Sequence, residues 1–261
     1  MPTFQGSRGH LLDLIDRPGW RDELNGILGA VGATIPSDSA HVPAGSVQPR
    51  EWNLVKFLQE HCITAMDVDR FSTWWVRQGA PPTWDLISQC LIDDRPGILL
   101  VEAKAHENEL SSEGKLITFR NLAGSPQDVM SRIARSLVNH GYIGRCIDEA
   151  RDGLRRFIPV ISIDRDRNYQ LSNRIASTWK VADCGMPAVL LYLGFTGDQG
   201  MASQGVPLRD KNHWDMVVRS HLRDLDAERL IDTNVVLANG CPLRFCIGDL
   251  GARRQSSIGN G

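Results

Sequence analysis

The chain has 261 residues, 42% of them hydrophobic, and its 29 Lys and Arg residues against 31 Asp and Glu residues give a formal net charge of −2. This composition is sufficient for one large buried core or two small ones. The balanced charge excludes a positive field over the whole molecule, so a nucleic-acid partner must bind a local patch.

The first residues, MPTFQGSRGHLLDLIDRPGW, lack the basic start and unbroken apolar stretch of a secretion signal. No apolar run approaches the roughly 20 residues that span a bilayer. We therefore expect a cytoplasmic protein with no membrane partner. The 6 cysteines are scattered along a core-rich chain, which predicts reduced and mostly buried thiols rather than disulfides.

Composition divides the chain into three parts: an N-terminal helical segment and linker over 1–48, an α/β domain over 49–250, and a flexible tail over 251–261. In the first part, WRDELNGILGAVG predicts a short helix weakened by its glycines. The stretch 32–49 is rich in Pro, Gly and Ser and predicts the linker.

The main body begins with a predicted helix over residues 50–62. Pro49 lies near its start, and apolar residues recur at helical spacing at Trp52, Val55 and Leu58.

Two apolar runs, 84–92 and 98–105, are separated by DDRPG, whose Asp, Pro and Gly are turn formers, and so predict a β-hairpin. A helix is the alternative for the second run, because Asp94 could cap it and EAKAHENEL consists of good helix formers. The continuous apolar stretch 98–101 has no polar face, which favours a strand covered on both sides. A helix or loop would then begin after Ala105.

Helical and strand patterns alternate over the remainder of the chain. The patterns predict a helix from Ser125 to Gly141, a strand in FIPVISI, a helix in YQLSNRIASTWKVADCG, a buried strand in AVLLYLGF, a helix in KNHWDMVVRSHLRDL and a late strand in PLRFCIGDL. Strands interleaved with helices predict a three-layer α/β/α sandwich around a central mixed sheet.

Two charged residues at the end of an apolar run indicate a site. If 98–105 is a strand, its period of two places Glu102 and Lys104 on one face. The hairpin then brings Asp85, from the paired strand, close to Glu102. Two neighbouring carboxylates repel unless one is protonated or a cation lies between them, and such oxygen ligands suit Mg²⁺ or Mn²⁺. The alternative is an ordinary solvated Glu–Lys pair.

Asp85 followed by Glu102-Ala103-Lys104 on the next strand resembles the PD-(D/E)XK nuclease superfamily, which has the restriction-endonuclease-like fold. Trp84 stands where that family has proline, and the aspartate is in place. The resemblance implies that Asp85, Glu102 and the Ala103 carbonyl hold one or two Mg²⁺ (or Mn²⁺) ions. It also implies that Lys104 orients or activates the attacking water.

Many members of that family add a glutamate from the preceding helix and a polar residue from a later one. Here Glu51 and Glu60 are the alternatives for the glutamate, and Glu51 is favoured because it lies nearer the apolar side of the predicted helix. Gln170, Asn173 and Arg174 share a helix face, and Gln170 is the expected contributor.

These residues predict a metal-dependent nuclease that hydrolyses phosphodiester bonds, with DNA as the expected partner. The rival hypothesis is a non-catalytic nucleic-acid-binding or assembly module, in which the acidic pair is a structural remnant. The resemblance also allows a homodimer.

Overall fold

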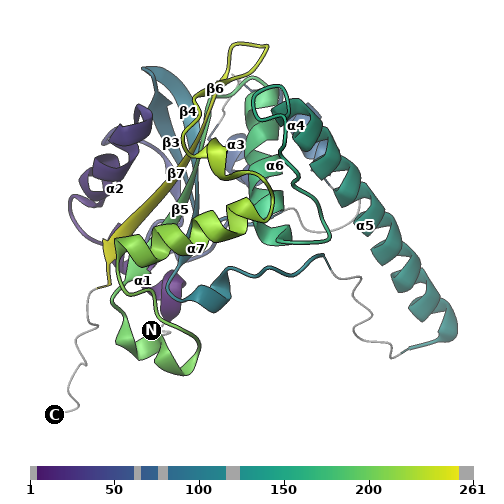
Figure 1. Cartoon of the computed structure of the whole chain (residues 1–261), viewed down its shortest axis with the longest axis horizontal. Helices are drawn as coiled ribbons and strands as arrows, with labels where there is room; N and C mark the ends of the chain where they lie inside the picture. The colour runs from purple at the N-terminus through teal and green to yellow at the C-terminus, as the bar shows by residue number, and fades with distance from the viewer. Residues whose placement is uncertain (1–4, 62–65, 76–81, 116–123, 253–261) are drawn as a thin grey trace.

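The computed structural model describes residues 5–61, 66–75, 82–115 and 124–252, and at its centre is a mixed sheet of seven strands (Figure 1). The sheet is strongly curled, into the shape of half a barrel. The strand order is β1-β3-β4-β5-β7-β6, with β2 also pairing with β3. The strands are β1 (Ala33–Thr34), β2 (His41–Val42), β3 (Leu86–Ile92), β4 (Arg95–Lys104), β5 (Ala188–Thr196), β6 (Val235–Val236) and β7 (Pro242–Gly251).

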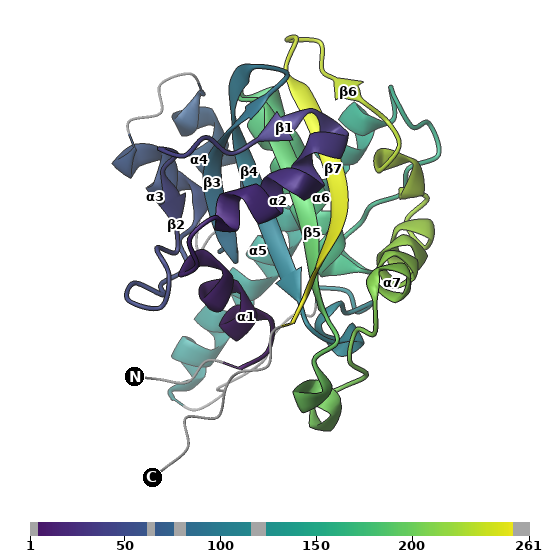
Figure 2. The same cartoon turned by 90° about the vertical axis from the view of Figure 1, so that its left-hand side faces the viewer.

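Helices cover both faces of this sheet (Figure 2). They are α1 (Gly6–Ile15), α2 (Trp20–Leu28), α3 (Leu54–Glu60), α4 (Val68–Trp75), α5 (Pro126–Leu154), α6 (Tyr169–Asp183) and α7 (Lys211–Arg223). Leu99 and Val101 of β4 pack in the cluster with α1 and α2, while Ile98 and Leu100 pack in the cluster with α3 to α7. The prediction of an α/β protein around a mixed sheet is confirmed. None of the helices in the described ranges is long and apolar enough to cross a membrane.

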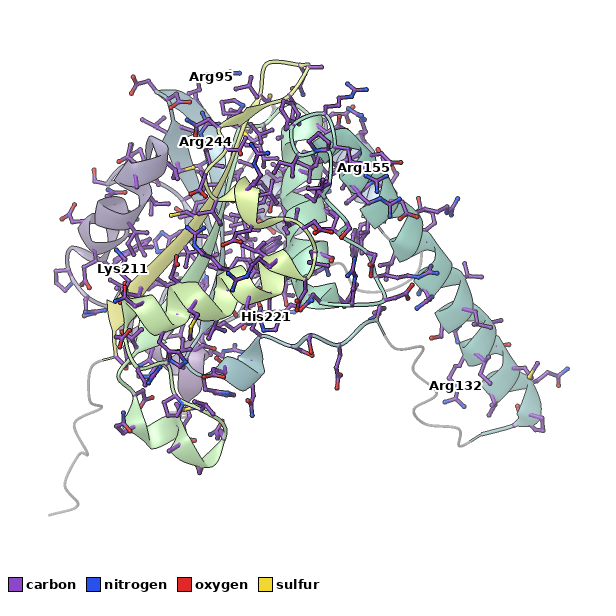
Figure 3. The ribbon with its side chains drawn as sticks, viewed as in Figure 1. Arg95, Arg132, Arg155, Lys211, His221 and Arg244 are labelled. Carbon is purple, nitrogen blue, oxygen red and sulfur yellow. The ribbon has the colours of Figure 1, made fainter. Side chains whose placement is uncertain are left out.

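The predicted β-hairpin is confirmed as β3 and β4, which pair antiparallel. Its turn is shorter than DDRPG, because only Asp93 and Asp94 lie outside the strands, both with positive φ (49° and 61°). Two side chains at this end of the sheet tie the hairpin to the neighbourhood of β7 (Figure 3). Arg244 Nη2 donates to Asp93 Oδ2 at 2.7 Å, and Arg95 Nη1 donates to the Gly240 carbonyl at 2.6 Å.

The stretch 32–49, which we expected to be a linker, forms part of the sheet instead. Its two short strands, β1 and β2, both pair with β3. Backbone pairing at the edge of a sheet does not require apolar periodicity, so composition alone could not reveal it. The domain boundary at residue 48 stays a prediction, although α1 and α2 pack directly on the sheet.

The helix expected over 50–62 begins later than predicted. Asn53 is extended, and its side chain accepts a hydrogen bond from the Lys56 N–H at 2.9 Å, so it caps a helix that starts at Leu54. Glu51 therefore precedes α3, and Glu60 is its last residue. The end that we expected at residue 62 lies outside the described residues.

Helix α5 begins as predicted but runs past the expected stop at Gly141, to Leu154. A helical glycine costs about 1 kcal/mol relative to alanine. Buried residues further along, including Cys146 and Ile147, belong to the large core cluster, and their packing stabilises the helix beyond Gly141. The first half projects away from the body (Figure 1), with Arg132 far from the sheet (Figure 3).

The later predictions are confirmed with one exception. The helix in YQLSNRIASTWKVADCG, the buried strand AVLLYLGF, the helix at 211 and the last strand are present as α6, β5, α7 and β7. FIPVISI is not a strand: residues 157–163 form turns and irregular chain. Most of the tail predicted to be flexible lies outside the described residues. The five cysteines in the described ranges are free and buried, as expected.

The buried indole of Trp214 fixes α7 against β5. A Cβ added at Gly194 would stand 2.7 Å from the indole, so only glycine permits this close approach. The indole N–H also donates to the Tyr192 carbonyl at 3.3 Å. Gly194 is paired in register with Lys104, so this contact supports the strand beside the charged residues of β4.

Gly194→Ala should lower the free energy of unfolding by about 1–3 kcal/mol, because the new methyl group displaces a fully buried tryptophan. Gly251→Ala, in the neighbouring strand, is the control, since no atom of the described residues lies within 4 Å of the added Cβ. Urea unfolding of the two variants checks this. Equal stability of the two variants would contradict the packing argument.

Candidate active site

The hairpin places Asp85 beside Glu102, as predicted. Leu86 of β3 pairs with Val101 of β4. Asp85 precedes Leu86 and Glu102 follows Val101, so these two residues come next along the hairpin on opposite sides. Because β3 starts only at Leu86, the Ala103 N–H lacks a strand partner on that side, and Asp85 Oδ2 accepts its hydrogen bond at 2.7 Å. One carboxylate oxygen of Asp85 thus accepts the backbone hydrogen bond that a neighbouring strand would otherwise accept.

Glu102 is 2% exposed and binds three donors. Lys104 Nζ and Gln170 Nε2 donate to its Oε1 at 2.6 and 2.7 Å, and Arg174 Nε donates to its Oε2 at 2.6 Å. A buried carboxylate is tolerated only when it is paired and hydrogen-bonded. The donors that the buried Glu102 carboxylate needs come from its own strand (Lys104) and from a helix (Gln170 and Arg174).

The first turns of α6 deliver two of these donors. Gln170 and Arg174 are four residues apart and therefore lie on the same helix face. The Arg174 guanidinium also lies over the Trp84 ring, with Cζ 4.4 Å from the ring centroid. A planar guanidinium held by a carboxylate and an aromatic face has little freedom left, so Arg174 is a fixed positive charge.

The two carboxylates have different affinities for protons. Burial, together with the negative charge of Glu102, raises the pKa of Asp85 to about 7. Burial would also raise the pKa of Glu102, but the positive charges of Arg174 and Lys104 outweigh it and lower that pKa. Glu102 is therefore ionised at neutral pH, while Asp85 is the group that exchanges a proton there.

Tyr192 adds an unused donor. On β5 it is paired in register with Glu102, and its buried hydroxyl has no hydrogen-bond partner among the described residues. Burial and the charge of Glu102 raise the pKa of Tyr192 well above its usual value, so the hydroxyl keeps its proton. A buried O–H without a partner is unfavourable and indicates that a ligand or water supplies the acceptor.

The oxygen atoms fit a divalent cation only in part. Carboxylates are the ligands that Mg²⁺ and Mn²⁺ prefer, and Asp85 accepts the Ala103 N–H through Oδ2 rather than through Oδ1. However, within the described ranges no group of three or more His, Cys, Asp or Glu side chains could hold a metal ion. Glu51 pairs with Arg8 Nη1 at 3.3 Å. Neither Glu51 nor Glu60 therefore joins the pair in a metal-sized cluster.

The structure brings together most of the residues singled out in the sequence: Asp85, Glu102, Ala103, Lys104 and Gln170. The arginines between residues 151 and 167 are mainly paired with neighbouring aspartates, which is typical of a solvated surface. These pairs include Arg151–Asp148 at 2.7 Å and Arg167–Asp164 at 2.9 Å.

Two important residues were missed. Arg174 was placed on the correct helix face, but nothing in its spacing distinguished it from Gln170 as a partner of Glu102. Tyr192 carries the only polar side-chain group between Ala188 and Phe195, which was an available signal.

Comparison of the chain with protein-family models, with curated proteins and with solved structures finds no match. The functional conclusion therefore depends on the geometry and chemistry of these side chains.

Asp85→Asn should make stability less dependent on pH. The folded protein holds a proton at Asp85 more tightly than the unfolded chain does, so the stability contributed there is present below about pH 4 and lost as pH rises through about 7. The asparagine variant should match the wild type near pH 4 and exceed it above pH 7, by on the order of a few kcal/mol. Urea unfolding between pH 4 and 8 measures this, and parallel stability curves would contradict it.

Proposed function

We propose that the chain is a metal-dependent nuclease of the restriction-endonuclease-like, three-layer α/β/α type, hydrolysing phosphodiester bonds in DNA with Mg²⁺ or Mn²⁺. The observation that carries this proposal is the pairing of the Asp85 and Glu102 carboxylates beside Lys104 at the end of the hairpin. The order of elements also supports it: α3 and α4, the hairpin, α5 and α6, and then β5, which is parallel to β4.

In this proposal Asp85, Glu102 and the Ala103 carbonyl hold the cation. When bound, the metal supplies Lewis-acid polarisation of the scissile phosphate and a bound water of lowered pKa. The positive charges of Arg174 and Lys104 keep Glu102 ionised, and the hydrogen bonds from Gln170 and Arg174 fix its orientation. Lys104 Nζ, now on Glu102, has further N–H donors for a phosphate oxygen or for the attacking water.

The net charge of the side chains around Asp85 and Glu102 determines when a divalent cation binds there. The two carboxylates, when ionised, are already balanced by Lys104 and Arg174. A divalent ion alone would leave a net charge of about +2 in a buried space, which is unfavourable. A phosphodiester brings one negative charge, and so nucleic acid should tighten metal binding. We infer weak binding by the free protein and stronger binding in the presence of substrate.

The alternative function is a non-catalytic nucleic-acid-binding or assembly module on the same scaffold. It is favoured by the three donors that already occupy Glu102, and by the lack of a third acidic ligand within the described ranges. In this case the acidic pair would serve only to hold α6 against the hairpin. Metal binding and cleavage separate the two functions.

Arg174→Gln should tighten Mn²⁺ binding by about tenfold or more, because it removes a buried positive charge but keeps an amide donor for Glu102. Arg145→Gln removes the same charge from the exposed surface of α5 and should leave the affinity unchanged. Isothermal titration with Mn²⁺ measures both. Nuclease function loses its basis if Mn²⁺ binds no more tightly to the wild type than to Glu102→Gln, with or without oligonucleotide.

Lys104→Ala should slow nicking of supercoiled plasmid by about 100-fold or more, because a positioned cationic donor to the reacting phosphate is lost. Lys211→Ala, which removes an exposed lysine at the start of α7, should cleave at the wild-type rate. Gel assays with Mg²⁺ and with Mn²⁺ give the rates. DNA binding without cleavage by the wild type would favour the non-catalytic module.

A further inference from the structure

A pocket of about 310 Å³ lies between α3, α4 and α6, beside the candidate site. Its floor is apolar and buried, and contains the aromatic side chains of Phe71, Trp75 and Trp84. Its rim is polar: Lys56 is half-buried and Gln59 is exposed. A buried aromatic floor with an accessible polar rim is typical of a site for a small planar ligand.

Trp84 joins this pocket to the carboxylate pair. It lines the pocket, its ring is in contact with the Arg174 guanidinium, and it directly precedes Asp85 in the chain. On α6, Ser177 lines the pocket one turn after Arg174, which binds Glu102. A ligand in the pocket therefore shares its wall with the residues that hold the acidic pair.

We propose that this pocket binds one unstacked nucleobase of a nucleic-acid strand. The inference rests on the proposed function and specifies how its substrate is held. Every base has a π-face, and stacking on aromatic side chains is a common way of binding bases without sequence preference. The amide of Gln59 offers donors and an acceptor to the edge of the base.

A positive charge at the rim of the pocket suits a phosphate beside such a base. Lys56 Nζ lies at the rim, 4.1 Å from the centroid of the Trp52 ring, whereas Arg174 contacts the Trp84 ring and is already paired with Glu102. A strand with one base in the pocket would place a neighbouring phosphate near Lys56. The volume, about 310 Å³, is at the lower end of the range for small-ligand pockets and suits one base with its sugar.

This arrangement predicts a preference for unpaired strands. A base inside a duplex must be unpaired and unstacked before it enters a pocket, and this cost is smallest for single-stranded or mismatched positions. Single-stranded or locally opened DNA should therefore bind more tightly than a fully paired duplex of the same sequence.

A variant whose new side chain fills the pocket tests the proposal. Ser72 lines the pocket, so Ser72→Phe should occupy it, whereas Thr73 on the same helix is exposed and does not line it, so Thr73→Phe is the matched control. The probe is a single-stranded oligonucleotide containing 2-aminopurine, whose fluorescence is quenched on stacking. EDTA is present throughout, so that cleavage does not contribute.

Wild type and Thr73→Phe should quench the probe, and Ser72→Phe should bind it between about 5-fold and 150-fold more weakly. An oligonucleotide in which every position is abasic should bind wild type and Ser72→Phe equally, because it has no base to place in the pocket. Deoxynucleoside monophosphates distinguish a free nucleotide from a strand as the source of the base. Binding of either source, lost in Ser72→Phe, supports the pocket.

Equal quenching by Ser72→Phe and Thr73→Phe would overturn the inference, as would the absence of binding to both probes. The result is separate from nuclease activity. If plasmid is cleaved but Ser72→Phe binds normally, the pocket assignment fails and the nuclease stands. If bases bind in the pocket but Lys104→Ala cleaves like the wild type, the assignment of the catalytic site fails instead.

Discussion

A buried negative charge at Glu102 is the constraint around which the charged part of this structure is arranged. The carboxylate is only 2% exposed, so its three donors are required for the fold as well as available for chemistry. Lys104 comes from the same strand, while Gln170 and Arg174 come from α6. The helix and the hairpin are thereby fixed around one charge. Burial, together with the negative charge of Glu102, raises the pKa of its neighbour Asp85 to about 7.

The same elements serve both proposed binding steps. The side chain of Trp84 lines the proposed base pocket, and Asp85, the next residue in the chain, supplies a carboxylate to the proposed metal site. Arg174 contacts both the Trp84 ring and Glu102. A base in the pocket and a phosphate beside Lys104 would therefore be neighbours along one strand. Because the existing charges already balance, the negative phosphate and the divalent cation are expected to stabilise each other's binding.

The sequence predicted those features that local patterns control. The apolar run before Glu102 indicated a strand, and its period of two placed Lys104 on the same face. The start of α3 was missed because the Asn53 cap outweighed a proline start, and the length of α5 was missed because tertiary packing overrode Gly141. Arg174 was missed as a partner of Glu102 because it meets that residue only through the crossover from β4 to β5, a contact between distant parts of the chain.

The most direct test of the account is the position of a cation in a crystal of the protein with Mn²⁺ and a phosphorothioate oligonucleotide that resists cleavage. The account predicts an anomalous manganese peak in contact with both Asp85 and Glu102, with a phosphate oxygen near Lys104 Nζ. An oligonucleotide bound elsewhere, with no manganese at these carboxylates and with Lys104 still on Glu102, would contradict it.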